Sequence, residues 1–208
     1  MLSNIDLKDY TLLPVMESFY TIQGEGCHQG KAAYFIRLAG CDVGCTWCDV
    51  KESWDANEHE ILSLKDLRKE LQSIKAETVV ITGGEPTMYN LEPLTAMIHE
   101  LGKKTHLETS AVYTITGSWD WICISPKRYK EAQPNDLLLA NELKVIIAHT
   151  NDFRFAQKYA KEVSENCKLY LQPEWSVAEE MLPEIISFVK LHPEFQISIQ
   201  AHKYMNVP

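Results

Sequence analysis

The chain has 208 residues, of which 45% are hydrophobic and 10% aromatic, and its formal net charge is −9 at pH 7. This length suits a single domain spanning residues 1–208, with enough apolar residues for a sizeable core. The acidic balance argues against binding to nucleic-acid phosphates, and a charged N-terminus without any apolar run near the ~20 residues that span a bilayer predicts a cytoplasmic protein that binds no membrane.

The first predicted strand, residues 15–22, ends in a turn that contains two glycines. This turn reads Gln23-Gly24-Glu25-Gly26, and its glycines allow a positive φ or a close approach to a ligand. The second predicted strand, residues 33–38, is apolar except for Arg37. An arginine in such a run is paired, points outward at an edge, or holds a carboxylate in a bidentate fork, and the sequence leaves these alternatives open.

Three cysteines follow directly after the second predicted strand. Cys41, Cys45 and Cys48 have the spacing Cys-x3-Cys-x2-Cys, and the small residues between them let the backbone fold tightly. Clustered cysteines in a cytosolic protein bind metal more often than they form disulfides. A four-iron cluster normally takes four cysteines, so three would leave one iron open to a substrate or cofactor.

The same cysteines allow other interpretations. A structural zinc ion prefers four ligands, and Cys27, His28 or His59 could supply the fourth. A disulfide pair or simply buried cysteines are further alternatives. We expect Cys27 not to be a ligand, and we predict that Cys123 and Cys167, which lie in or beside apolar runs, are core residues.

Beyond the cysteines, predicted strands alternate with helices. An irregular connection is predicted over residues 51–59, Ser63 is predicted to cap a helix that ends near Ser73, and Asn151 to cap a helix over residues 151–165. The alternation predicts a parallel α/β sheet, and about six core strands indicate a partial, open parallel (β/α) barrel. Further helices are predicted over residues 91–101 and 177–191, and further strands over residues 78–82, 105–108, 119–124, 143–148, 169–171 and 195–199.

Polar or glycine-rich residues recur just after the predicted strands. Ligands of parallel α/β folds bind at the carboxyl ends of the strands, so we expect these loops to converge on one site. Strand-end loops attract polar residues in any case, so the pattern supports a site only together with the cysteines. The loops are Cys41–Cys48, Thr82–Pro86, Glu108–Ser110, Ser125–Lys127 and Gln172–Trp175.

The cysteine spacing, with Trp47 before the last cysteine, resembles the signature of the radical S-adenosylmethionine superfamily. Further stretches, in the same order along the chain, resemble one family within it, the 7-carboxy-7-deazaguanine synthases of queuosine biosynthesis. The turn after the first strand and the His-Lys ending are the most specific of these matches. The matching stretches are Tyr20–Gly26, Arg37, Thr82–Pro86, Ser125–Lys127, Gln172–Pro173 and Gln200–Pro208.

This resemblance implies a radical S-adenosylmethionine fold and a carbon–nitrogen lyase activity. The substrate would be 6-carboxy-5,6,7,8-tetrahydropterin, which loses ammonia and contracts its ring to give 7-carboxy-7-deazaguanine. A deoxyadenosyl radical would abstract hydrogen from C6 and later recover it. The implied cofactors are a [4Fe-4S] cluster, S-adenosylmethionine and magnesium. The implied partners are a reductant such as flavodoxin or ferredoxin and a second copy of the chain.

The resemblance also implies roles for individual residues. Cys41, Cys45 and Cys48 would hold the cluster. The S-adenosylmethionine site would comprise Trp47, Cys48, Asp49, Gly84, Ser125, Pro126, Lys127, Gln172, Pro173, Glu174 and Trp175. The pterin site would comprise Ile22, Gln23, Gly24, Glu25, Arg37, Thr82, His202 and Pro208, the last through its terminal carboxylate.

One position departs from the family pattern. The family often has a hydroxyl residue two positions after the last cysteine, where it ligates a magnesium ion, and this chain has Val50 there. Because magnesium prefers oxygen ligands, the ion would need other groups or matter less in this protein.

Two other functions remain open at this level. A radical activase that forms a glycyl radical on a partner protein has a similar size and the same three-cysteine loop. A non-enzymatic zinc or iron–sulfur module needs the cysteines but no substrate pocket. The Gln23–Gly26 turn, Arg37 and His202 favour the enzyme that acts on a small molecule.

Overall fold

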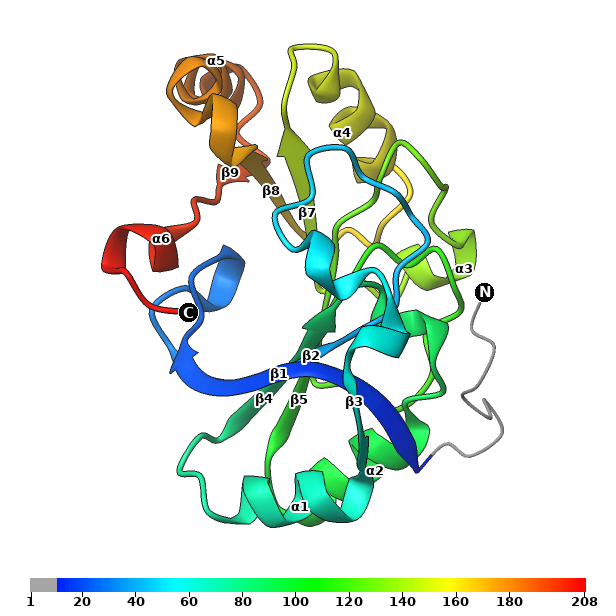
Figure 1. Cartoon of the computed structure of the whole chain (residues 1–208). Helices are drawn as coiled ribbons and strands as arrows, with labels where there is room; N and C mark the ends of the chain where they lie inside the picture. Colours follow the sequence, from blue (N-terminus) through cyan, green and yellow to red (C-terminus); the bar gives the residue numbers. More distant parts are fainter. Residues whose placement is uncertain (1–10) are drawn as a thin grey trace.

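The computed structural model describes residues 11–208, which contain a nine-stranded mixed sheet (Figure 1). The strands lie in the order β3-β1-β2-β4-β5-β6-β7-β8-β9. All neighbours from β2 to β9 are parallel. The strands are β1 Leu12–Ile22, β2 Ala32–Leu38, β3 Glu60–Ser63, β4 Thr78–Gly83, β5 Lys104–Thr109, β6 Trp121–Ile124, β7 Glu142–Ile147, β8 Lys168–Pro173 and β9 Phe195–Ile197.

The connections between the parallel strands carry most of the helices, as is usual for parallel crossovers. The α-helices are α1 Leu64–Gln72, α2 Glu92–Glu100, α3 Pro134–Leu137, α4 Asp152–Ala160, α5 Ala178–Leu191 and α6 Ala201–Met205. Short 3-10 helices are η1 Gly26–His28, η2 Lys51–Ser53, η3 Ala56–Glu58, η4 Pro86–Met88 and η5 Trp175–Val177. Among residues 11–208, no helix is both long and apolar enough to cross a membrane.

The sheet is curved and stays open, which agrees with the predicted partial barrel. Its edges are β3 and β9, and the chain after β9 comes round towards the turn that follows β1 (Figure 1). There the backbone N–H of Ala201 donates to the carbonyl of Gly24 at 2.9 Å. The C-terminal segment therefore covers part of the gap that a closed barrel would fill with strands.

Two strands depart from the predicted parallel arrangement. β1 pairs antiparallel with both β2 and β3. The connection between Ile22 and Ala32 is too short for a parallel crossover, which needs a dozen or more residues, so β2 must return beside β1 as a hairpin. β3 was not expected at all, because its four residues show no clear period and are ordered by pairing with Leu12–Val15 of β1.

The predicted helix caps have different outcomes. Ser63 caps α1 as expected, since its hydroxyl accepts from the backbone N–H of Asp66 at 3.2 Å. Asn151 occupies the N-cap position of α4 as predicted, but its side chain makes no capping hydrogen bond. The carboxylate of Asp152 instead accepts from the backbone N–H groups of Ala148 and His149, which fixes the turn before α4.

The core lies between the sheet and the surrounding helices. Its fully buried side chains include Ile36, Ile81 and Leu107 from adjacent parallel strands. Cys123 is 1% exposed, which confirms it as a core residue. Cys167 is half-buried and packs against the margin of the core rather than within it. The strands are thus held by apolar packing on their helix-covered face, which leaves their carboxyl ends for polar residues.

Candidate active site

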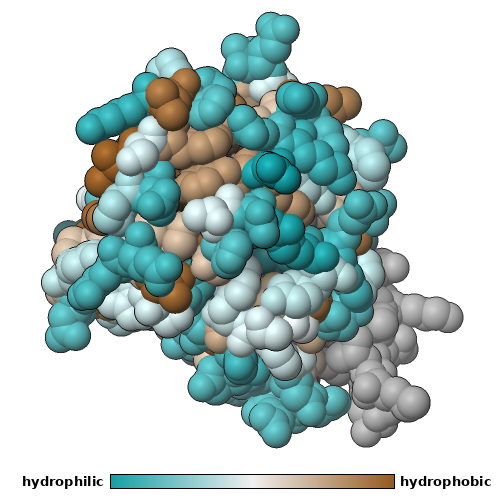
Figure 2. Space-filling view, turned by 90° about the horizontal axis from the view of Figure 1, so that it is seen from above, coloured by the Kyte–Doolittle hydropathy of each residue, from teal (hydrophilic) through white to brown (hydrophobic). Residues whose placement is uncertain are grey.

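A cavity of about 280 Å³ lies at the carboxyl ends of the parallel strands. Seen from above, this end of the molecule shows apolar side chains set among hydrophilic ones (Figure 2). The cavity brings together every residue predicted for the cluster, the cofactor and the substrate except Pro126, which is buried beside it. The strand-end loops therefore converge as the sequence pattern predicted.

The cysteine loop follows β2 and forms one wall of the cavity. Its backbone is fixed by hydrogen bonds from Cys41 N to Trp54 O at 3.1 Å and from Cys48 N to Cys45 O at 3.2 Å. Gly44, at φ +73°, supplies a left-handed turn between the first two cysteines. The three cysteines pack together with Val43, so their side chains gather in one small apolar cluster.

The three thiols fit a four-iron cluster. Cys45 is 7% exposed, and Cys41 and Cys48 are half-buried beside it. Burial raises the pKa of the Cys41 and Cys45 thiols, and the nearby Lys127 ammonium counteracts this rise at Cys45. Within residues 11–208, no three His, Cys, Asp or Glu side chains converge tightly enough for a single metal ion. A cubane makes no such demand, because each thiolate binds its own iron.

The turn after β4 lies against the cysteine loop. A Cβ atom on Gly84 would overlap the carbonyl of Gly40 and crowd Cys41, so this close approach requires glycine. Glu85, which is 1% exposed, accepts hydrogen bonds from the backbone N–H groups of Thr87 at 3.1 Å and Ser110 at 2.9 Å. The buried carboxylate thus ties this turn to the end of β5.

Near the cysteine loop, polar residues that follow β6 or lie on β8 line the cavity. Lys127 donates to the hydroxyl of Ser125 at 2.7 Å, and its ammonium lies 5.2 Å from the ring centroid of Trp47. Burial lowers the pKa of Lys127. Gln172 is 2% exposed, and its side-chain oxygen accepts from Ser198 at 2.7 Å. These residues present a cation, an amide and hydroxyls close to the cysteine loop.

Arg37 lies on β2 beside Thr82 of β4 and faces the cavity. Its side chain is 19% exposed, and its Nε donates to Glu17 at 2.7 Å. Arg37 therefore both pairs with a neighbouring strand and lines the cavity. Glu17 accepts from Nε, so the terminal nitrogens of the guanidinium take no part in this ion pair.

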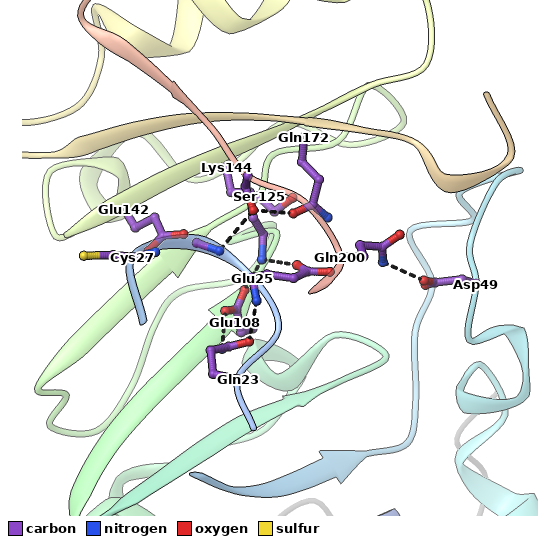
Figure 3. Close-up of polar contacts among 12 residues, drawn as sticks. Gln23, Glu25, Cys27, Asp49, Glu108, Ser125, Glu142, Lys144, Gln172 and Gln200 are labelled. Atoms are coloured by element: carbon purple, nitrogen blue, oxygen red, sulfur yellow. Dashed lines mark hydrogen bonds and ion pairs between the residues drawn. The ribbon is translucent and has the colours of Figure 1, made fainter. Parts of the chain in front are cut away.

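The C-terminal segment borders the cavity between the turn after β1 and the cysteine loop. Thr21 donates to a terminal oxygen of Pro208 at 3.2 Å, and a Cβ on Gly24 would overlap the ring of His202. Asp49, next to the last cysteine, accepts from Gln200 at 3.3 Å (Figure 3). The chain end is thereby held between the turn after β1 and the cysteine loop.

Comparison with known proteins assigns the chain to a family. Residues 35–166 match the Radical SAM superfamily. The chain is 49% identical over 197 residues to a 7-carboxy-7-deazaguanine synthase of Flavobacterium psychrophilum, covering 95% of this chain and 93% of that protein. The chain belongs to the 7-carboxy-7-deazaguanine synthase family. A synthase of the same name from Synechocystis is 45% identical over 93% of each chain.

A solved member of this synthase family has the same fold. The crystal structure of QueE from Escherichia coli superposes with a TM-score of 0.84 at 28% identity, covering 96% of this chain and 100% of that one. The expected superfamily, its open barrel and the synthase family are thus all confirmed. A [4Fe-4S] cluster and S-adenosylmethionine follow from membership of the superfamily.

Sequence reasoning missed two charged residues of the cavity. Glu108 was noted only as part of a strand-end loop, and Lys144 was read as part of a buried strand. Both line the cavity and form an ion pair at 2.9 Å. A lysine inside the apolar run of residues 143–147 was the signal that could have revealed them, because a buried charge needs a partner.

Proposed function

We propose that this chain converts 6-carboxy-5,6,7,8-tetrahydropterin to 7-carboxy-7-deazaguanine with loss of ammonia, as a lyase of queuosine biosynthesis. The main support for this proposal is that a single cavity is lined both by the three cysteines and by the residues expected to bind the pterin. The three cysteines lie on one wall, and the turn after β1, Arg37 and the C-terminal segment lie on the others. A radical enzyme that acts on a small molecule needs its cluster and its substrate pocket to share one cavity.

The cysteine loop would hold the cluster through Cys41, Cys45 and Cys48. The cluster and S-adenosylmethionine, when bound, supply the radical that abstracts hydrogen from the substrate. The chain's own task is to orient the substrate and to exclude water. Val43 and Val112 pack around Cys45 and form an apolar surface at this wall.

The S-adenosylmethionine site would run along the cysteine loop to the ends of β4, β6 and β8. Gly84 has no side chain, so its backbone can approach the methionine amino group. Ser125 and Lys127 would serve the carboxylate or ribose oxygens, because a hydroxyl and an ammonium donate hydrogen bonds. The remaining expected contacts are Trp47, Asp49, Pro126, Gln172, Pro173, Glu174 and Trp175, of which all but Pro126 line the cavity.

The pterin would lie between the turn after β1 and the C-terminal segment. Arg37 would fork its carboxylate, since Glu17 holds the guanidinium by Nε and orients the terminal N–H groups. Thr82 lies beside Arg37 in the sheet, and Ile22, Gln23, Gly24, Glu25, His202 and Pro208 would complete the pocket.

Magnesium would be held mainly by groups other than residue 50. Val50 lines the cavity but has no side-chain oxygen. The ion keeps several waters in protein sites, so the substrate carboxylate and water can supply its ligands. We also propose that the protein is a cytoplasmic homodimer and that a flavodoxin or ferredoxin reduces the cluster.

The deciding experiment is turnover of anaerobically reconstituted, reduced protein. Incubation with S-adenosylmethionine and 6-carboxytetrahydropterin should give 7-carboxy-7-deazaguanine by mass spectrometry, with S-adenosylmethionine largely conserved. Cleavage of S-adenosylmethionine without any deazaguanine product would contradict the proposal and favour an activase. Zinc without iron or sulfide in the purified protein would reject radical chemistry altogether.

A further inference from the structure

A buried lysine lies between two carboxylates at the substrate end of the cavity (Figure 3). Lys144 projects from β7, and its side chain is 5% exposed. Its Nζ lies 2.6 Å from Oε2 of Glu25 and 2.9 Å from Oε2 of Glu108. A charge so well buried is tolerated only when it is paired, so these two contacts account for the presence of lysine in an apolar strand.

Gln23 joins the carboxylate of Glu108 to the backbone of Glu25. The side-chain amide of Gln23 donates to Oε1 of Glu108 at 3.4 Å, and its oxygen accepts from the backbone N–H of Glu25 at 3.1 Å. Lys144 and Gln23 therefore connect the turn after β1 with β5 and β7. Loss of Lys144 would leave Glu25 and Glu108 without their shared cation.

The charge balance around Lys144 shows why that cation matters. Burial alone would raise the pKa of Glu25, but Lys144, with smaller effects of His202 and Gln200, lowers it to about 2. Burial alone would lower the pKa of Lys144, but Cys123 on β6, Glu108, Glu25 and Glu142 on β7 raise it well above its usual value. Without Lys144 the two carboxylates would repel each other, and Lys144 would no longer oppose the rise that burial causes in the pKa of Glu25.

The remaining charged groups nearby have other contacts. Glu142 accepts from Cys27 N at 3.1 Å and from the indole of Trp121 at 3.2 Å, and it does not line the cavity. His202 lies on the C-terminal side of Glu25, and Lys127 donates to Ser125. Lys144 is thus the cation in direct contact with both Glu25 and Glu108.

We propose that Lys144 is a positioning residue that holds the carboxylates of Glu25 and Glu108 together and turned into the cavity, as acceptors for the N–H groups of the substrate's pyrimidine ring. This inference rests on the proposed function. An ionised carboxylate only accepts hydrogen bonds, whereas a protonated one presents a donor on one oxygen. A donor facing a ring N–H leaves both groups unpaired, which sharply weakens recognition.

The test compares Lys144→Met with wild-type holoenzyme in turnover of the carboxytetrahydropterin. The pterin KM is expected to rise by about tenfold or more, the effect of losing one charge-assisted hydrogen bond. Iron content and uncoupled cleavage of S-adenosylmethionine are expected to stay at wild-type values. The KM of Lys144→Met should also fall as pH is raised, because burial then raises the pKa of Glu25 without Lys144 to oppose it.

Two further variants separate positioning from folding. Lys144→Arg keeps the charge and should have a pterin KM closer to wild type than Lys144→Met does. Lys144→Met with Glu108→Gln removes one charge of each sign, so it should fold even where the single variant does not, and its KM should stay raised. Lys103→Met is the matched control, because Lys103 binds the carbonyls of Ile74 and Ala76 away from the cavity.

The outcomes are distinguishable from failure of the proposed function. Wild-type protein without deazaguanine product refutes the function itself. Active wild type together with an unchanged, pH-independent KM in Lys144→Met or in the double variant refutes the role of Lys144. If the pterin KM of Lys144→Arg is raised as much as that of Lys144→Met, the proposed role of Lys144 is also refuted, because the positive charge would then make no difference.

Discussion

Single side chains decide the chemistry that this scaffold can carry. The three clustered cysteines share one wall of the cavity, while Cys123 is buried in the core. Arg37 combines a structural contact with Glu17 and a position in the cavity. At this scale each proposed role concerns one functional group, so single substitutions test it directly.

Replacing any one of Cys41, Cys45 and Cys48 by alanine should abolish the cluster and turnover. A cubane with two protein thiolates has lost one iron ligand. Cys123→Ala and Cys167→Ala are the controls and should leave both properties intact, because neither residue lines the cavity. Iron and sulfide measured after reconstitution check this, and full iron in any of the first three variants would refute the ligand assignment.

Arg37→Lys should impair pterin binding more than cleavage of S-adenosylmethionine. Lysine keeps the charge but cannot contact Glu17 and a substrate carboxylate with the same planar fork. Loss of a charge-assisted hydrogen bond costs about 1.5–3 kcal/mol, so the pterin KM should rise by about tenfold or more.

The matched control for Arg37 is Arg68→Lys, which alters a surface arginine paired with Glu100 at 2.8 Å. Steady-state kinetics in the pterin concentration should show no change for this variant. An unchanged KM in Arg37→Lys as well would mean that Arg37 serves only the sheet.

At the scale of elements, the site depends on segments that meet only through the fold. The last segment of the chain forms helix α6 followed by residues 206–208. It contacts the end of β1 through Thr21, the following turn through Gly24, and the cysteine loop through Asp49. This one segment therefore joins the turn after β1 to the cysteine loop.

A C-terminal affinity tag, or deletion of Val207 and Pro208, should weaken pterin binding. Either change removes the free carboxylate that lies beside Thr21 and lines the cavity. Iron content and uncoupled cleavage of S-adenosylmethionine should survive, since the cysteines are untouched. The control is the same tag at the N-terminus, which precedes every motif of the site. Equal pterin KM values for the two tagged proteins would contradict a role for the terminal carboxylate.

At the scale of the whole molecule, the sheet buries titratable groups at both ends. The end opposite the cavity contains His106 on β5, whose ring centroid lies 4.5 Å from that of His28. His106 is 8% exposed, and burial lowers its pKa to about 4. A histidine with a lowered pKa in the folded state favours unfolding in acid, because the unfolded chain binds its proton more readily.

The free energy of unfolding should therefore fall as pH is lowered from about 6.5 towards 4, the window between the unfolded and folded pKa values of His106. The full contribution is up to about 3 kcal/mol. His106→Phe keeps an aromatic ring and should reduce the slope. Urea unfolding of both proteins at pH 7 and pH 5 measures the difference, and equal slopes would show that His106 does not titrate on unfolding.

The sequence alone determined the superfamily, the cysteine ligands proposed for the cluster and most of the residues around the cavity. This was possible because the motifs are local and because the ends of parallel strands meet at one edge of a sheet. The three cysteines lie within eight positions, so their proximity needs no knowledge of the fold.

Only the tertiary structure decided which distant residues share a contact. The pairing of Lys144 with Glu25 and Glu108 joins three separate strands or turns, and no local pattern encodes it. β3 is likewise a strand only because β1 pairs with it, and Asp152 displaces Asn151 as the group that binds the turn before α4. Ion pairs and sheet edges depend on long-range packing, which outweighs the weak preferences of short segments.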